Sequence, residues 1–232
     1  VDFISWQSAT YIIGFINLII ACLFYLLLPK SQHFQPYPFR FSRFKAAFEQ
    51  NLKDRKLRIL FAEGFILMGC LVTVFNYISY HLLEAPFQLS QSWIGLISIA
   101  YLAGIYSSSK AAQWSFKYGR AKVLPLMLLM MMAGLLITLI PALWAILLGL
   151  IIFAFAFFAA HSTASSWVSV QAIQYRAVAA SLYLFCYYIG SSLLGSSGGL
   201  IWENFGWIGI NLSVVLVLAV GLFLTFYLHD TK

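Results

Sequence analysis

Long apolar stretches separated by short polar segments make up most of this chain. Seven of them reach the roughly 17 to 25 residues that a helix needs to cross a bilayer. They are Ala9–Leu28, Ile59–Tyr80, Trp93–Ser109, Val123–Ile140, Ala142–Ala160, Ala179–Trp202 and Ile208–Leu228. The pattern predicts an all-α membrane protein with seven transmembrane helices.

The fourth and fifth stretches form one apolar run that is too long for a single crossing. Pro141 interrupts this run. Proline lacks a backbone N–H and clashes with the preceding helical turn, so we expect a tight hairpin here at the membrane surface. Farther along, Ser191, Gly195 and Gly199 follow one another at intervals of four residues, which predicts a helix face that packs closely against a neighbour.

The composition agrees with lipid as the main solvent, because only 9% of the residues are charged and 62% are hydrophobic. A soluble domain carries about a quarter charged residues. The cysteines Cys22, Cys70 and Cys186 all lie inside apolar stretches without the spacing of metal ligands, which is typical of small packing residues. No nucleophile–base pair or phosphate-binding glycine loop is present, so we expect neither an enzyme nor a bound cofactor or metal.

The cations are all on one side of the seven-helix path. Eight of the 14 lie in residues 29–58, four lie between the third and fourth stretches, and the others are Arg176 and Lys232. The opposite side carries only Asp2, Glu84 and Glu203 as charged residues. By the positive-inside rule the basic side is cytoplasmic. We therefore expect a multi-pass protein of the inner (plasma) membrane, with the first residue outside and the last residue inside, and no nucleic-acid partner.

Residues 29–58 form the longest polar segment. Within it, "FSRFKAAFEQNLKDRKL" places Phe41, Phe44, Phe48 and Leu52 three or four residues apart, with charged residues between them. This spacing predicts an amphipathic helix that lies on the inner leaflet of the lipid bilayer. We expect its cations to anchor and orient the segment, and specific recognition of anionic lipid stays open as an alternative.

One helix, a long basic connector and six helices with short loops resemble the second half of a major facilitator superfamily transporter, preceded by its sixth helix. The segments "FAFFAAHSTASSWV" and "ASLYLFCYYIGSSLLGSSGGLIWENFGW" resemble bacterial carriers of the YnfM and arabinose-efflux-like group. The resemblance implies that residues 1–28 are the last helix of an N-terminal bundle and that residues 29–58 are a cytoplasmic linker. Residues 59–232 would form the C-terminal six-helix bundle, whose partner is the missing N-terminal half.

The resemblance also implies a function. Such carriers work by alternating access, so we expect proton-coupled efflux of a small organic compound. Two alternatives stay open, namely a non-transporting half or remnant and a seven-helix receptor-like protein. A retinal protein is excluded, because no lysine lies within any of the seven stretches.

The loop "SFKYGRAKVL", residues 115–124, resembles the cytoplasmic G-x-x-x-D-R-x-G-R-R signature of the superfamily. The residues that carry this likeness and that we assign to a cytoplasmic gating loop are Lys117, Gly119, Arg120 and Lys122. Phe116 stands where the acidic residue belongs, and Ala112 stands in place of the first glycine. We therefore expect weakened gate chemistry in this loop.

The cavity of such a transporter is implied to lie between helices seven, eight, ten and eleven. Polar groups are costly in lipid and tend to line cavities. Our candidates for the substrate and proton pathway are Glu63, Asn76, Tyr77, Tyr101, His161, Tyr183 and Tyr187. Glu63 is the only acid within a stretch. It is either a carboxylate that binds and releases protons during transport, or a partly hydrated group paired with cations of the inner face. His161 is either part of the pathway or a hydrogen-bonded structural residue.

Overall fold

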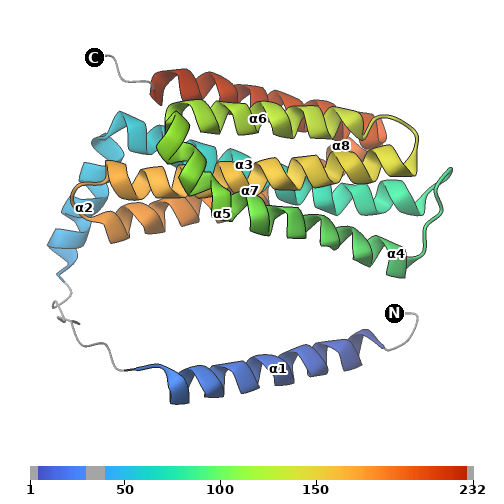
Figure 1. Ribbon diagram of the computed structural model, residues 1–232, viewed down its shortest axis with the longest axis horizontal. Coiled ribbons are helices and arrows are strands. Elements are labelled where there is room, and N and C mark those ends of the chain that lie inside the picture. Colours follow the sequence, from blue (N-terminus) through green and yellow to red (C-terminus); the bar gives the residue numbers. More distant parts are fainter. Residues whose placement is uncertain (1–4, 30–39, 229–232) are drawn as a thin grey trace.

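The computed structural model describes residues 5–29 and 40–228, and every regular element within them is helical (Figure 1). The elements are α1 (Trp6–Leu27), α2 (Phe41–Lys53), α3 (Arg55–Leu83), α4 (Gln91–Leu96), η1 (Ile97–Tyr101), α5 (Leu102–Tyr118), α6 (Arg120–Ile137), α7 (Leu143–Gln171), α8 (Arg176–Thr225) and η2 (Phe226–Leu228). From α3 onward the long helices lie side by side in one bundle, and α1 lies apart from it (Figure 1). The predicted all-α class is confirmed.

Five of the described helices are long and apolar enough to cross a membrane, namely α1, α3, α6, α7 and α8. The 50-residue α8 contains the sixth predicted stretch and most of the seventh, whose last three residues form η2. Helix α8 bends between the two stretches at Gly206, whose φ of 56° is outside the helical range. The third predicted stretch is helical throughout, but it divides into α4, the 3-10 helix η1 and α5, which follow one another without a gap. Gly95 and Ser98 lie at this division, and both residue types favour an α-helix less than alanine does.

The hairpin predicted at Pro141 is confirmed. Helix α6 ends at Ile137 and α7 begins at Leu143, with Pro141 in the connection between them. Two glycines allow the helices to approach closely, because a Cβ atom on Gly134 would lie 2.8 Å from the carbonyl oxygen of Gly149.

A close contact between helix backbones joins α3 to the first part of α8. Gly190 lies directly against the backbone of Phe65, and a Cβ atom on Gly69 would lie 2.9 Å from the carbonyl oxygen of Gly190. Residues without side-chain bulk allow helix backbones to approach in this way. Gly190, Gly195 and Gly198 are buried here, whereas Ser191 and Gly199 are half-buried. The small-residue face predicted at Ser191, Gly195 and Gly199 therefore meets α3 at Gly195 and at Gly199, where a Cβ atom would lie 3.4 Å from the Tyr77 hydroxyl.

The amphipathic helix predicted over residues 41–57 ends earlier than expected. Helix α2 stops at Lys53, and Asp54 begins α3. The Asp54 carboxylate accepts hydrogen bonds from the backbone N–H groups of Lys56 at 2.8 Å and Leu57 at 3.1 Å. A side chain that caps the first N–H groups of a helix fixes where that helix begins.

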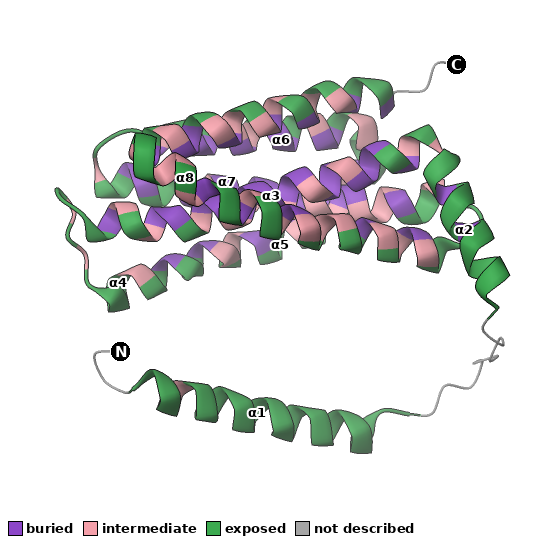
Figure 2. Ribbon diagram, turned by 180° about the vertical axis from the view of Figure 1, so that it is seen from behind, coloured by how far each residue is buried: buried purple, intermediate pink, exposed green. Residues whose placement is uncertain are grey.

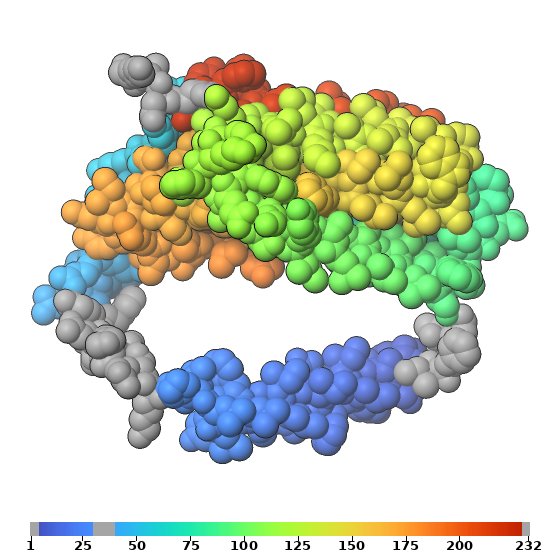
Figure 3. All heavy atoms as spheres, in the orientation of Figure 1, coloured from blue at the N-terminus to red at the C-terminus, as the bar shows by residue number. Residues whose placement is uncertain are grey.

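Burial is concentrated in the middle of the bundle. Buried residues follow α3 and α7 along most of their length, whereas α1 has none (Figure 2). The space-filling view likewise shows α1 separated from the bundle by open space (Figure 3). The apolar side chains of α1 are thus exposed on all sides, which is compatible with lipid or a further helical bundle as its neighbour.

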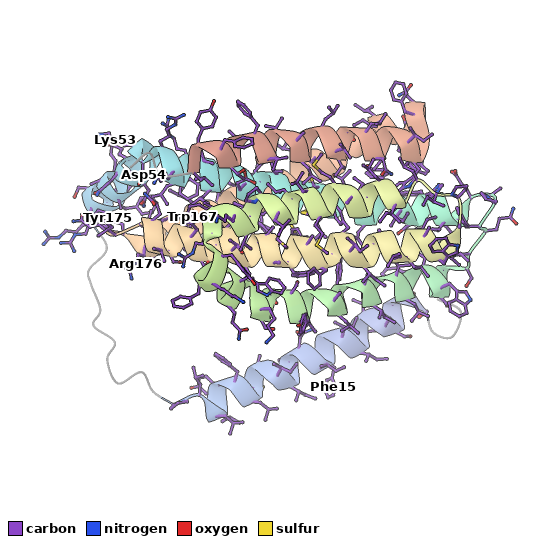
Figure 4. All side chains as sticks on the ribbon, turned by 45° about the horizontal axis from the view of Figure 1, so that its top comes forward. Phe15, Lys53, Asp54, Trp167, Tyr175 and Arg176 are labelled. Atoms are coloured by element: carbon purple, nitrogen blue, oxygen red, sulfur yellow. The ribbon has the colours of Figure 1, made fainter. Side chains whose placement is uncertain are left out.

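The basic connectors meet at one end of the bundle. Lys53, Asp54, Tyr175 and Arg176 lie together at this end in Figure 4. The amide of Gln171 donates a hydrogen bond to the Asp54 carboxylate at 2.9 Å. The Arg55 guanidinium lies 4.6 Å from the ring centroid of Tyr227. The cations of α2 and of the α7–α8 turn thus share one end, and its cytoplasmic location stays a prediction.

Replacement of Gly190 tests the contact between α3 and α8. A valine side chain would collide with the backbone of Phe65, which has no room to move away. We expect G190V to lower the free energy of unfolding by about 2 kcal/mol or more, as overpacking does in a close-packed interior. Thermal unfolding in detergent measures this change. Gly95→Val is the control, because nothing lies within 4 Å of a Cβ atom there; equal losses in both variants would contradict the prediction.

Candidate functional site

Three of the predicted pathway residues meet where α7 contacts α8. The Nδ1 atom of His161 and the hydroxyl of Tyr183 are 3.0 Å apart and share a hydrogen bond. The ring of Tyr187 lies 4.7 Å from that of His161, between centroids. On the other side, Phe157 stacks on His161 with ring planes 9° apart. We call His161, Tyr183 and Tyr187 the α7–α8 cluster.

The α7–α8 cluster is held against α3 by a glycine. Tyr183 is only 2% exposed, and a Cβ atom on Gly64 would lie 2.8 Å from its ring. Only a glycine on α3 therefore leaves room for the tyrosine ring. Glu63 precedes Gly64 in the chain, so the turn of α3 that carries this acid also contacts the cluster.

Glu63 is completely buried between α3 and the second part of α8. Its exposed fraction is 0%, and its Oε2 atom lies 3.2 Å from where a Cβ atom on Gly221 would be. Neither carboxylate oxygen has a hydrogen-bond partner among the described residues. Among the described residues, no cation is paired with Glu63, and its role in transport stays a prediction.

This burial has an energetic consequence. An ionised carboxylate in an apolar interior costs many kcal/mol unless it is paired and hydrogen-bonded. Glu63 consequently needs a bound proton or a cationic partner, and the described part of the chain supplies no such partner. A carboxyl group in this position is chemically suited to exchange a proton whenever water reaches it.

Tyr101 is connected to the α7–α8 cluster through a series of ring contacts. It lies 5.8 Å from Phe158, centroid to centroid, in an edge-to-face arrangement. Phe158 in turn contacts Phe157 at 5.1 Å, the ring that stacks on His161. Tyr101 and Phe158 are half-buried. Tyr101 is therefore connected to His161 through Phe158 and Phe157. We call Tyr101, Phe158 and Tyr187, which are half-buried, the aromatic surface, and its part in a pathway stays a prediction.

Asn76 and Tyr77 lie in a different place. They line a cavity of about 410 Å³ near the end of α3, together with Phe75, Ser79, Tyr80, Leu83 and Gln91. Asn76 is exposed, so its amide is available to a ligand. The hydroxyl of Tyr77 instead donates a hydrogen bond to the carbonyl of Gly195 at 3.0 Å, and its ring packs on Gly198. The geometry of Tyr77 is that of a structural link between α3 and α8.

The predicted gating loop is a tight turn between α5 and α6. Gly119 forms it with a φ of +85°, a conformation that glycine adopts without steric cost. Lys117 lies 5.1 Å from the ring centroid of Tyr118, and the Nε atom of Arg120 is buried without a hydrogen-bond partner among the described residues. Lys122 and Phe116 are exposed, Phe116 at 95%. Within residues 5–29 and 40–228, no acidic side chain forms an ion pair with the cations of this turn.

Sequence reasoning missed a polar network in two helices that looked uniformly apolar. The Thr138 hydroxyl donates to the Leu135 carbonyl at 2.6 Å and lies 3.5 Å from the side-chain oxygen of Asn211. The Trp207 indole donates to the Thr138 carbonyl at 3.3 Å. Thr138 and Asn211 are buried. A lone asparagine within an apolar stretch was the available signal, since such a residue requires a partner. The network joins the end of α6 to the second part of α8.

A change at Tyr77 separates its structural role from a substrate role. Tyr77→Phe removes the hydrogen bond to Gly195 and should lower the free energy of unfolding by about 1 kcal/mol. Transport per folded molecule should stay unchanged, because the hydroxyl is engaged within the protein. Thermal unfolding and transport assays measure the two effects, and the exposed neighbour Tyr80→Phe serves as the control. Loss of transport with unchanged stability would contradict this assignment.

Comparison with known proteins agrees with this architecture. A family model described as Major Facilitator Superfamily matches residues 1–195. An uncharacterized transporter of Buchnera aphidicola subsp. Schizaphis graminum is 46% identical to the chain over 97% of its length, which covers 54% of that relative. The inner membrane transport protein YnfM of Escherichia coli is 44% identical over 98% of the chain and 55% of the relative. The uncharacterized MFS-type transporter YybF of Bacillus subtilis is 40% identical over 98% of the chain and 56% of the relative.

The chain thus spans little more than half the length of the curated relatives it matches. The likeness to transporters extends over nearly all of its residues, and it agrees with the resemblance to a C-terminal half that the sequence indicated. The chain belongs to the major facilitator superfamily of membrane transporters.

Proposed function

We propose that the chain is the C-terminal part of a proton-coupled exporter of small organic compounds. The observation that carries the proposal is the position of Glu63, a fully buried carboxyl group without a partner among the described residues. It adjoins the Tyr183 ring through Gly64, and Tyr183 is hydrogen-bonded to His161. Ionisable residues in such surroundings are typical of proton pathways in transporters.

Alternating access requires two bundles that move around a site between them. The chain supplies one bundle and the separate helix α1, and its relatives are nearly twice as long. The second bundle in the proposal is the N-terminal half of the complete transporter. The aromatic surface of Tyr101, Phe158 and Tyr187 is half-buried in this bundle, so the other half would complete the substrate site there.

In this mechanism Glu63 carries a proton while it is buried between α3 and α8. Opening of the contact between these helices admits water and allows the proton to leave, because the ionised carboxylate is then hydrated. Tyr183 connects the opening at Glu63 to the aromatic surface. Its ring contacts the α3 turn that carries Glu63, and its hydroxyl holds the His161 ring, so movement of α3 changes the position of the aromatic surface.

Replacement of Glu63 by glutamine tests this proposal. Glu63→Gln keeps the size of the side chain but cannot exchange a proton, so export driven by a pH gradient should fall to the background level. The measurement uses inverted vesicles that contain the complete transporter, with ethidium and radiolabelled arabinose as probes and an uncoupler to collapse the gradient.

Glu84→Gln is the matched control, because Glu84 is an exposed acid and this change should leave export intact. Export by the Glu63→Gln variant at the wild-type rate would refute proton coupling through this residue. Transport of neither probe by the wild-type protein would instead favour a non-transporting remnant or a different substrate class.

A further inference from the structure

Helix α2 has one face packed on the bundle and an exposed apolar face about a quarter turn away. Ala47 and Asn51 are 1% and 2% exposed, because α2 packs against α3 and α8 along this side. The neighbouring side carries a stripe of apolar residues whose side chains remain exposed. They are Phe41, Phe44, Phe48 and Leu52, with exposed fractions of 70%, 45%, 38% and 37%. At about 100° per residue, the stripe is centred roughly 90° from Ala47 and Asn51.

The bundle therefore fixes the direction in which the apolar stripe faces. Helix α2 crosses the end of the bundle at a steep angle to the long helices, as Figures 1 and 2 show from opposite sides. If the long helices cross the membrane, α2 runs along its surface. A helix in that orientation has one side on the protein, one side on the lipid and the remainder in water, which matches the three sides of α2.

The polar side of α2 is basic. Arg40, Lys45 and Lys53 are exposed, and Arg55 follows at the start of α3. The helix contains one acid, Glu49, which lies 3.9 Å from the Lys45 ammonium group with both side chains more than half exposed. An ion pair this exposed is weak, so the positive charge next to the apolar stripe remains available to anionic headgroups.

We propose that α2 is a binding surface for anionic phospholipid. The stripe of Phe41, Phe44, Phe48 and Leu52 enters the boundary between headgroups and acyl chains, and Lys45 and Lys53 contact the phosphate layer. Ala47 and Asn51 hold the helix against the bundle. Charge complementarity selects anionic lipid over zwitterionic lipid.

Lipid binding at α2 has a consequence for the bundle. Asp54 follows directly after α2, caps α3 and accepts a hydrogen bond from Gln171 at the end of α7. The membrane-bound helix is thus tied to α3 and α7, the elements that carry Glu63 and His161. Residues 41–53 of the connector are then fixed to the lipid surface at a constant position relative to α3 and α7.

The test places a fluorescent label on two sides of α2 in the complete transporter. Cys22, Cys70 and Cys186 are first replaced, by Cys22→Ser, Cys70→Ala and Cys186→Ala, and a nitrobenzoxadiazole label is attached through Phe48→Cys or, as the matched control, Gln50→Cys. The protein is reconstituted in phosphatidylcholine vesicles that contain a small fraction of nitroxide-labelled phosphatidylglycerol or nitroxide-labelled phosphatidylcholine. Iodide is the quencher in water.

We expect the label at position 48 to be quenched by nitroxide lipids and protected from iodide, and the label at position 50 to show the opposite. Quenching at position 48 should be severalfold stronger with labelled phosphatidylglycerol than with labelled phosphatidylcholine. Lys45→Gln should reduce this preference, by about fivefold at most for a single cation near the surface, and Glu49→Gln should increase it.

Three results would overturn the proposal. Protection of position 48 from both quenchers would show that another protein segment covers the stripe. Equal exposure of positions 48 and 50 to iodide would show that α2 does not rest on the bilayer. Equal quenching by both lipids, unchanged by Lys45→Gln, would remove the preference for anionic lipid.

Discussion

The contact between the backbones of α3 and α8 is the constraint on which the rest of the structure depends. Gly69 and Gly190 allow it, because lipid provides little hydrophobic drive for helix association and close packing must supply the attraction. Other glycines along the same two helices determine where the side chains of the candidate site lie. Gly64 leaves room for the Tyr183 ring, and Gly221 leaves room for the Glu63 carboxylate. A bulkier residue at any of these positions would move a functional side chain as well as a helix.

Burial and polarity divide the bundle into a structural part and a candidate functional part. Tyr77 and Asn211 have their hydrogen bonds satisfied inside the protein, to Gly195 and to Trp207. Glu63 has none among the described residues. In an apolar interior an unsatisfied group is costly and a satisfied one is stable, so this difference separates a residue that holds helices together from one suited to exchange a proton.

The helices and the Pro141 hairpin were predictable, because twenty apolar residues in lipid have few alternatives to a helix. The division of Trp93–Ser109 and the end of α2 were not, since an average over a long window does not register Gly95, Ser98 or the Asp54 cap. The candidate site was predicted as a set of residue types only. Tyr77 and Tyr183 look alike in sequence, and their different roles arise from partners far along the chain, Gly195 and His161.

In the proposed mechanism Glu63 holds a proton while it is buried between α3 and α8 and releases it when water reaches the carboxyl group. Infrared spectroscopy of the complete transporter in lipid, recorded as a function of pH, tests this most directly. We expect one carboxylic-acid carbonyl band that appears and disappears reversibly with pH, is absent in Glu63→Gln and persists in Glu84→Gln. A spectrum in which Glu63 stays an ionised carboxylate at every pH would contradict it.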